Sequence, residues 1–171
     1  MNFLELAKAR FSVRSFKKDA IETEKLNAIL EAGRVAPSAC NKQPQKIYVI
    51  QSEENRAKLA SVCRFTFDAP VILAVCYDND RTWKNDLMPG YQSGETDAAI
   101  VCTHMMLEAW ELGIGSCWVG WFNADEIKTT LGLPENVTLS ALLPIGYPAE
   151  DANPTKLHTK IRDFEDTVTV M

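Results

Sequence analysis

Few residues of this chain could act as nucleophiles, bases or metal ligands, and they are scattered. There are two histidines, His104 in an apolar stretch and His158 near the C-terminus, and five cysteines, no two closer than 13 residues. That spacing excludes the Cys-x-x-Cys pairs of zinc and redox sites. A catalytic zinc site would also need a cluster of ligands that the sequence lacks. We therefore expect a bound cofactor to carry any chemistry.

Basic residues near the two ends of the chain form a second candidate group. Arg10 and Arg14 frame a short basic segment, and Lys160 and Arg162 stand close to the C-terminus. The chain has 18 Lys and Arg against 23 Asp and Glu, which gives a net charge of −5. This acidic balance argues against nucleic acid or an anionic membrane as a partner. Any anion that binds must meet a local cluster of cations.

The glycines between residues 113 and 120 have the spacing of nucleotide-binding loops without their key residues. Gly113 and Gly115 are followed by Trp118 where a dinucleotide fingerprint needs its third glycine. Gly115 and Gly120 have phosphate-loop spacing, but Trp121 stands where that loop needs lysine. Neither nucleotide motif is present.

Helices and strands alternate in the pattern predicted for residues 1–148. Helices are expected where apolar residues recur at helical spacing or a capping box opens a segment, and strands where apolar runs lie between turn residues. The expected helices begin at Asn2, span 22–33, 53–60 and 94–112, and begin again at Asn123; the expected strands are 47–50, 71–77, 116–119 and 137–145. The alternation favours a three-layer α/β or α+β domain.

The segment 94–112 gives the strongest helix signal. From Ala98 to Leu107 its only acidic or basic residue is His104, so the helix is apolar nearly all round. Such a helix runs through a core or into a subunit interface. Asp97 is expected to cap it. The polar segment 81–93 before it is expected to be a loop or lid.

The length and composition predict one soluble domain. A chain of 171 residues buries roughly 70% of its unfolded surface. Its uncharged stretches are too short for a membrane helix, and its start lacks the pattern of a signal peptide. Free cysteines, odd in number, fit a reducing compartment. The prediction is a cytoplasmic protein.

Residues 149–171 show neither a helical nor a strand period. The stretch is either disordered or an arm that crosses a partner subunit. Phe164, Val168 and Val170 are unusual choices for a solvated tail, which favours the arm.

A series of segments, taken in order, resembles the signatures of the flavin-dependent nitroreductases. They are residues 10–14, residues 36–44, Asp97 with the long helix, and residues 112–120, 144–148 and 160–162. The resemblance covers essentially the whole chain. It implies an α+β fold of three layers, α/β/α, with a mostly antiparallel central sheet flanked by helices. It also implies a homodimer, with the long helix at its interface and an extended C-terminal arm, 149–171, that packs on the partner subunit.

The resemblance further implies FMN as the cofactor. The positions that match phosphate-binding residues are Arg10, Ser12 and Arg162, with Lys160 alongside, and Arg14 matches a residue at the N1/O2 edge of the flavin ring. The full set of implied cofactor-binding residues is Arg10, Phe11, Ser12, Arg14, Asn41, Gln43, Cys117, Trp118, Val119, Gly120, Lys160 and Arg162. Gly120 would allow close approach of the ring to the backbone.

The implied activity is hydride transfer from NADH or NADPH and reduction of a flat, electron-poor acceptor such as a nitroaromatic or a quinone, in ping-pong order. Three alternatives stay open. One is a specialised relative, such as a reductive dehalogenase of iodotyrosine, with substrate contacts from loop 81–93. The others are a flavin-binding module without redox activity and a cysteine hydrolase that uses Cys40 or Cys117. Trp118 and Trp121 could line the acceptor site or belong to the core.

Overall fold

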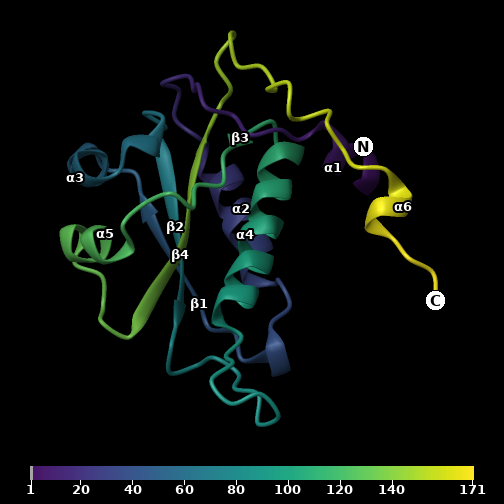
Figure 1. The fold of residues 1–171 in the computed structure, drawn as a ribbon. Coiled ribbons are helices and arrows are strands. Elements are labelled where there is room, and N and C mark those ends of the chain that lie inside the picture. Colours follow the sequence, from purple (N-terminus) through teal and green to yellow (C-terminus); the bar gives the residue numbers. More distant parts are fainter. Residues whose placement is uncertain (1) are drawn as a thin grey trace.

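An antiparallel sheet of four strands forms the middle layer of the computed structural model, which describes residues 2–171 (Figure 1). The strands are β1 (Gln45–Ile50), β2 (Val71–Asp78), β3 (Gly115–Ser116) and β4 (Val137–Gly146). They lie in the order β1-β2-β4-β3, and each pairs antiparallel with its neighbour. The predicted antiparallel sheet is confirmed.

Helices cover both faces of the sheet. On one side lie α2 (Thr23–Arg34) and α4 (Gly94–Glu111), and on the other lie α3 (Glu53–Val62) and α5 (Ala124–Leu131) (Figure 1). Four shorter pieces complete the chain: α1 (Phe3–Ala9), α6 (Phe164–Thr167), and the 3-10 turns η1 (Ala39–Asn41) and η2 (Arg64–Thr66). The three-layer α/β/α arrangement is therefore as predicted.

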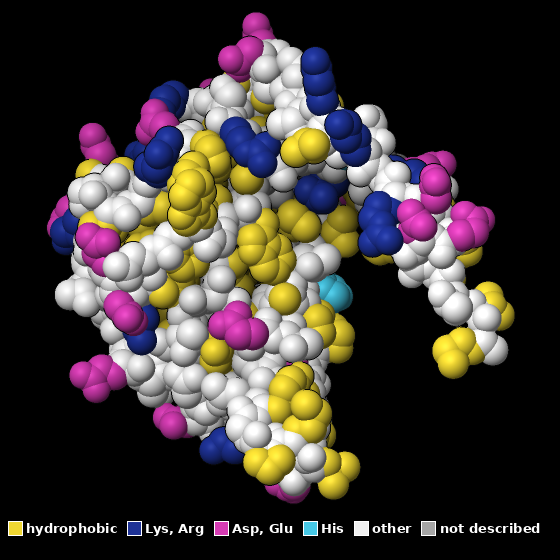
Figure 2. Space-filling view, in the orientation of Figure 1, with side chains coloured by type: hydrophobic (Ala, Val, Ile, Leu, Met, Phe, Trp, Pro, Cys, Tyr) yellow, Lys and Arg dark blue, Asp and Glu magenta, His cyan; other side chains and the backbone are white. Residues whose placement is uncertain are grey.

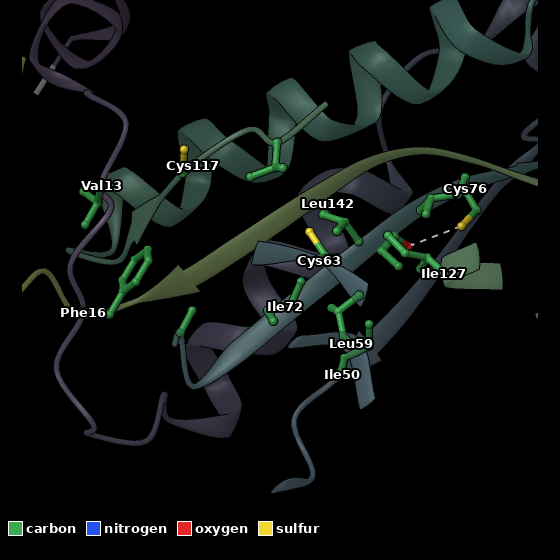
Figure 3. Close-up of a cluster of buried hydrophobic side chains, with 14 of the residues drawn as sticks. Val13, Phe16, Ile50, Leu59, Cys63, Ile72, Cys76, Cys117, Ile127 and Leu142 are labelled. Carbon is green, nitrogen blue, oxygen red and sulfur yellow. Dashed lines mark hydrogen bonds between the residues drawn. The ribbon is translucent and has the colours of Figure 1, made fainter. Parts of the chain in front are cut away.

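The central strand β2 explains how the two faces are filled. Its residues are buried almost without exception, and successive side chains point to opposite faces. Ile72 belongs to the core cluster under α3 and α5, which Figure 3 shows, whereas Leu73 belongs to the cluster under α2 and α4. A strand buried on both faces reads as a continuous apolar run rather than an alternating one.

Two helix starts form as their sequences predict. The Asn2 side chain accepts a hydrogen bond from Glu5 N at 2.9 Å, and the Glu5 carboxylate accepts one from Asn2 N at 3.0 Å. Asn123 caps α5 by accepting from Glu126 N at 3.3 Å. These caps satisfy amide groups that a helix start otherwise leaves unpaired.

The strand expected at 116–119 is shorter than predicted. Strand β3 ends at Ser116, and pairing with β4 resumes only at Val119, which exchanges hydrogen bonds of 2.9 and 3.1 Å with Leu142. Between them, Cys117 N donates to Pro144 O at 3.2 Å. Pro144 has no N–H to donate in return, so the ladder is interrupted there.

The C-terminal segment runs over the end of the sheet and then away from the body of the protein (Figure 1). It contains one helical turn, α6, which the sequence pattern did not predict. Leu157, Ile161 and Phe164 are 71%, 80% and 68% exposed. Among residues 2–171, no helix is both long enough and apolar enough to cross a membrane.

Candidate functional site

The segment from Arg10 to Arg14 forms one wall of a cleft of about 320 Å³. The C-terminal arm forms the opposite wall. The residues that line this cleft are Arg10, Phe11, Ser12, Arg14, Thr155, Leu157 and His158. None of them, within the described chain, is an aspartate or a glutamate. The cleft therefore offers two guanidinium groups and hydroxyls with no competing carboxylate, which suits an anion.

Burial of Val13 fixes the direction of its neighbours. Val13 is fully buried, and its N–H donates to Ser116 O at 2.9 Å. Successive side chains of an extended segment point to opposite sides, so Ser12 and Arg14 face away from the core. Gly115 makes this packing possible, because a Cβ there would lie 2.6 Å from Cγ2 of Val13.

A second, smaller cleft of about 180 Å³ shares Arg14 with the first. It is lined by Arg14, Phe65, Phe67, Cys117, Trp118, Val119, Gly120 and Trp121. A Cβ at Gly120 would meet nothing within 4 Å, so the space beside this backbone is open. Trp118 and Trp121 are 37% and 78% exposed, which places them at the cleft rather than in the core.

The thiol of Cys117 is buried beside both clefts. Burial raises its pKa, and this effect is opposed by the positive charge of Arg14, a hydrogen bond with Ser12 and the charge of Arg10. Arg10, Ser12 and Arg14 therefore lie close to Cys117 in the structure. A thiol with a raised pKa is a poor nucleophile, so Cys117 is poorly suited to serve as the nucleophile of a cysteine hydrolase.

We expect only one of the five cysteines to react rapidly with a disulfide reagent under native conditions. Cys40 is exposed, whereas the other four are buried. Burial also raises the pKa of Cys76 and of Cys102 to about 12, which suppresses the reactive thiolate. Titration with dithiobisnitrobenzoate should show one fast thiol per chain, and five after denaturation. Cys40→Ser should remove the fast phase; a fast phase that persists would contradict this assignment.

Asn41 and Gln43 lie in the loop 36–44, at the other end of α4. The Gln43 side-chain amide donates to Asn41 Oδ1 at 3.0 Å, and both residues have positive φ angles, 52° and 48°. Asp97 holds this loop: its Oδ1 accepts from Ala39 N at 2.9 Å, and its Oδ2 accepts from the Ser93 hydroxyl at 2.6 Å.

The prediction that Asp97 caps the long helix is wrong. Ser93 occupies the N-cap position, and α4 begins at Gly94, which puts Asp97 four residues inside. Its own N–H already bonds to Ser93 O at 2.8 Å in the first helical turn. Asp97 is almost completely buried, and its carboxylate ties the loop 36–44 to the helix instead.

Replacing Asp97 with alanine should lower the free energy of unfolding by about 1–3 kcal/mol, because a buried serine hydroxyl and the Ala39 N–H lose their acceptor. Asp97→Asn keeps an oxygen for the Ala39 N–H and should lose less. Denaturant unfolding of the two variants and the wild type measures the difference. Equal stability of Asp97→Ala and wild type would show that the carboxylate does not hold the loop.

The implied cofactor residues outside the C-terminal arm fall into two groups at opposite ends of α4. Phe11 packs edge-on against Trp110 in the last turn, with ring centroids 5.1 Å apart, whereas the loop 36–44 is bonded to Asp97 in the first turn. Those two helix residues are 13 positions apart, about 20 Å along the axis. Within one chain, the segment Arg10–Arg14 therefore lies close to Cys117–Gly120 but far from Asn41 and Gln43.

Lys160 and Arg162 are exposed on the arm and do not line the basic cleft. Arg162 donates instead to the backbone oxygen of Asp166 at 3.0 Å. Thr155 and His158, which the implied set does not contain, line the cleft in their place. His158 packs edge-on against Phe11 with ring centroids 6.2 Å apart. The one feature of the sequence that could have pointed to His158 as a cleft residue is that it lies two positions before Lys160.

Phe65 and Phe67 were also missed from sequence. Phe65 lies within η2 and Phe67 follows it, and Phe65 stacks on Trp121 with ring centroids 5.3 Å apart and an interplanar angle of 25°. The two stacked residues are far apart in the chain, and no local period marks such a contact. Only the packing of α3 and α5 on the same face reveals it.

The sequence and the fold both resemble those of known proteins. A family model described as the nitroreductase family matches residues 7–64 and 63–147. A crystal structure of a nitroreductase family protein from Clostridium difficile 630 is 38% identical, with a TM-score of 0.92 over 99% of this chain and 98% of that one.

Two further relatives have names that mention FMN. An FMN-dependent nitroreductase from Clostridium difficile R20291 is 25% identical, with a TM-score of 0.80 and 98% of each chain covered. An FMN reductase (NAD(P)H) of Bacillus subtilis is 30% identical over 156 residues, which cover 81% of this chain and 63% of that protein. With the family match spanning most of the sequence and the same three-layer fold, the chain belongs to the nitroreductase family.

Proposed function

We propose that the protein is an FMN-dependent oxidoreductase that takes hydride from NADH or NADPH and reduces a flat, electron-poor acceptor. The observation that carries this proposal is the pair of clefts that share Arg14. One cleft is basic, and the other lies between the backbone of Cys117–Gly120 and the aromatic rings of Phe65, Phe67 and Trp121. A molecule with a phosphate at one end and a flat ring at the other fits such a pair. The names of the FMN-dependent relatives support the same cofactor.

The residues present suit FMN. Arg10 and Ser12 would hold the phosphate, since the basic cleft has no carboxylate among its described lining residues. The backbone of Cys117–Gly120 would lie along the ring, where the missing ladder bond at Pro144 and the open space at Gly120 leave room.

When bound, FMN supplies the capacity to accept a hydride from the nicotinamide and to pass two electrons to the acceptor. The chain's own contribution is electrostatic and positional. Arg14 places a positive charge between the two clefts, where it would stabilise negative charge on a bound, reduced flavin ring. Trp118 and Trp121 provide an apolar wall for a flat acceptor. Donor and acceptor would use the same open face in turn, which gives ping-pong kinetics.

A homodimer would complete the site. Packing α4 antiparallel against α4 of a second copy would bring the loop 36–44 of one chain to the Arg10–Arg14 segment of the other. Thr103 and Leu107 are half-buried on α4 and belong to neither core cluster. The exposed apolar residues of the arm, such as Ile161 and Phe164, would then be covered. Figure 2 shows the hollow between the arm and the body that a second copy would fill.

Titration of flavin-free protein with FMN tests the cofactor assignment. We expect one FMN per chain, with riboflavin bound more weakly because it lacks the phosphate. Initial rates measured against NAD(P)H concentration, at several fixed acceptor concentrations, should give parallel double-reciprocal lines. A protein that takes up no FMN would refute the proposal, and intersecting lines would refute the ping-pong order.

A further inference from the structure

A third cleft adjoins the proposed flavin site on the side away from the basic cleft. It has a volume of about 420 Å³ and is lined by Val62, Cys63, Arg64, Phe65, Trp121, Phe122 and Asn123. Phe65 and Trp121 line both this cleft and the one at Cys117–Gly120. The three clefts thus form a continuous series, linked first by Arg14 and then by the Phe65–Trp121 stack.

The walls of the outer cleft are flat and aromatic. The Phe65 and Trp121 rings are stacked 5.3 Å apart, and Trp121 keeps 78% of its surface exposed. Figure 2 shows hydrophobic side chains gathered on this face, between β3 and α5, with basic side chains beside them. Exposed aromatic rings next to a concave surface favour the binding of another flat ring.

Arg64 is the one charged residue among those lining the outer cleft in the described chain. Its guanidinium carbon lies 5.0 Å from the centroid of the Phe65 ring. The ion pairs found within residues 2–171 do not include Arg64, so its charge is uncompensated. A cation held over the same aromatic stack selects a ligand that carries a carboxylate beside its ring.

We infer that the outer cleft extends the acceptor site and that the preferred acceptors are aromatic carboxylates. The aromatic ring packs on Trp121, which lines both this cleft and the one beside the proposed flavin, and the carboxylate reaches into the outer cleft to pair with Arg64. This inference rests on the proposed function for its role in turnover, but the binding itself does not depend on it. The volume suits a ligand of one or two rings, since ligand sites of a few hundred Å³ enclose small molecules of that size.

Calorimetric titration of the full-length, flavin-loaded protein, without NAD(P)H, tests the inference. The probes are 4-nitrobenzoate and its neutral analogue 4-nitrobenzamide. We expect the wild type to bind the acid about threefold to tenfold more tightly than the amide, as for a partly desolvated ion pair. Arg64→Gln should abolish this preference. Trp121→Ala should weaken both ligands about fivefold, because both lose the stacking contact.

Arg81→Gln is the matched control, because Arg81 is exposed and lies at the opposite end of β2 from Arg64. It should leave the preference for the acid unchanged. Equal binding of acid and amide by the wild type, or equal effects of the two arginine variants, would overturn the inference. Unchanged affinity of Trp121→Ala for both ligands would also overturn it. A protein that binds no flavin but still prefers the acid would refute the proposed function and the role of the cleft in turnover, and would leave the binding of aromatic carboxylates standing.

Discussion

Replacing Arg10 with alanine should weaken FMN binding about 10-fold to 100-fold while leaving riboflavin binding nearly unchanged. The guanidinium lines a cleft in which no carboxylate competes for it among the described residues. A charge-assisted hydrogen bond to a phosphate contributes about 1.5–3 kcal/mol, which corresponds to that range. Fluorescence titration of flavin-free protein with FMN and with riboflavin measures both affinities.

The comparison of the two flavins separates a phosphate contact from a general loss of structure. Lys17→Ala is the matched control, since Lys17 is an exposed cation three residues beyond this segment and lines neither cleft. It should change FMN affinity less than about twofold, because exposed charges are well screened. If Arg10→Ala weakened riboflavin binding as much as FMN binding, the phosphate would not lie in the basic cleft.

Leu107→Glu should turn the proposed dimer into a monomer and reduce FMN binding to a small fraction of the wild-type level. Leu107 lies on α4, half-buried, and belongs to neither core cluster. A glutamate at this position would place a desolvated charge within the apolar α4–α4 contact of each chain. The loop that carries Asn41 and Gln43 would then no longer reach the flavin of the partner. Sedimentation velocity and FMN titration measure the two effects.

Ala60→Glu provides the control for this variant. Ala60 is exposed on α3, on the opposite face of the sheet, and the substitution adds the same charge. It should remain dimeric and bind FMN as the wild type does. Circular dichroism should confirm that both variants are folded. A folded Leu107→Glu monomer that binds FMN with full affinity would show that one chain holds the complete site.

Local patterns predicted most of the elements because these elements depend on near neighbours. The capping pair of Asn2 and Glu5 and the apolar run of β2 each specify a structure within a few residues. The length of β3 was not predictable in this way. It depends on Pro144, which lies opposite Cys117 in another strand and cannot donate to it.

The candidate site was predicted in part, and the reason lies in the distances between its residues along the chain. The resemblance pointed to Arg10, Arg14 and Cys117, and the structure brings these three together. It did not point to Phe65 or His158, which reach the clefts only through tertiary packing. The role of Asp97 was misjudged because a carboxylate near a helix start usually caps it, and here the backbone N–H of Ala39, in the loop 36–44, donates to that carboxylate instead.

Anaerobic reduction of the flavin-loaded protein tests the central claim most directly. On addition of one equivalent of NADH or NADPH, the visible flavin band should bleach, and a nitroaromatic acceptor added afterwards should restore it. A flavin band that neither NADH nor NADPH changes would contradict the assignment of this protein as an NAD(P)H-dependent flavin oxidoreductase.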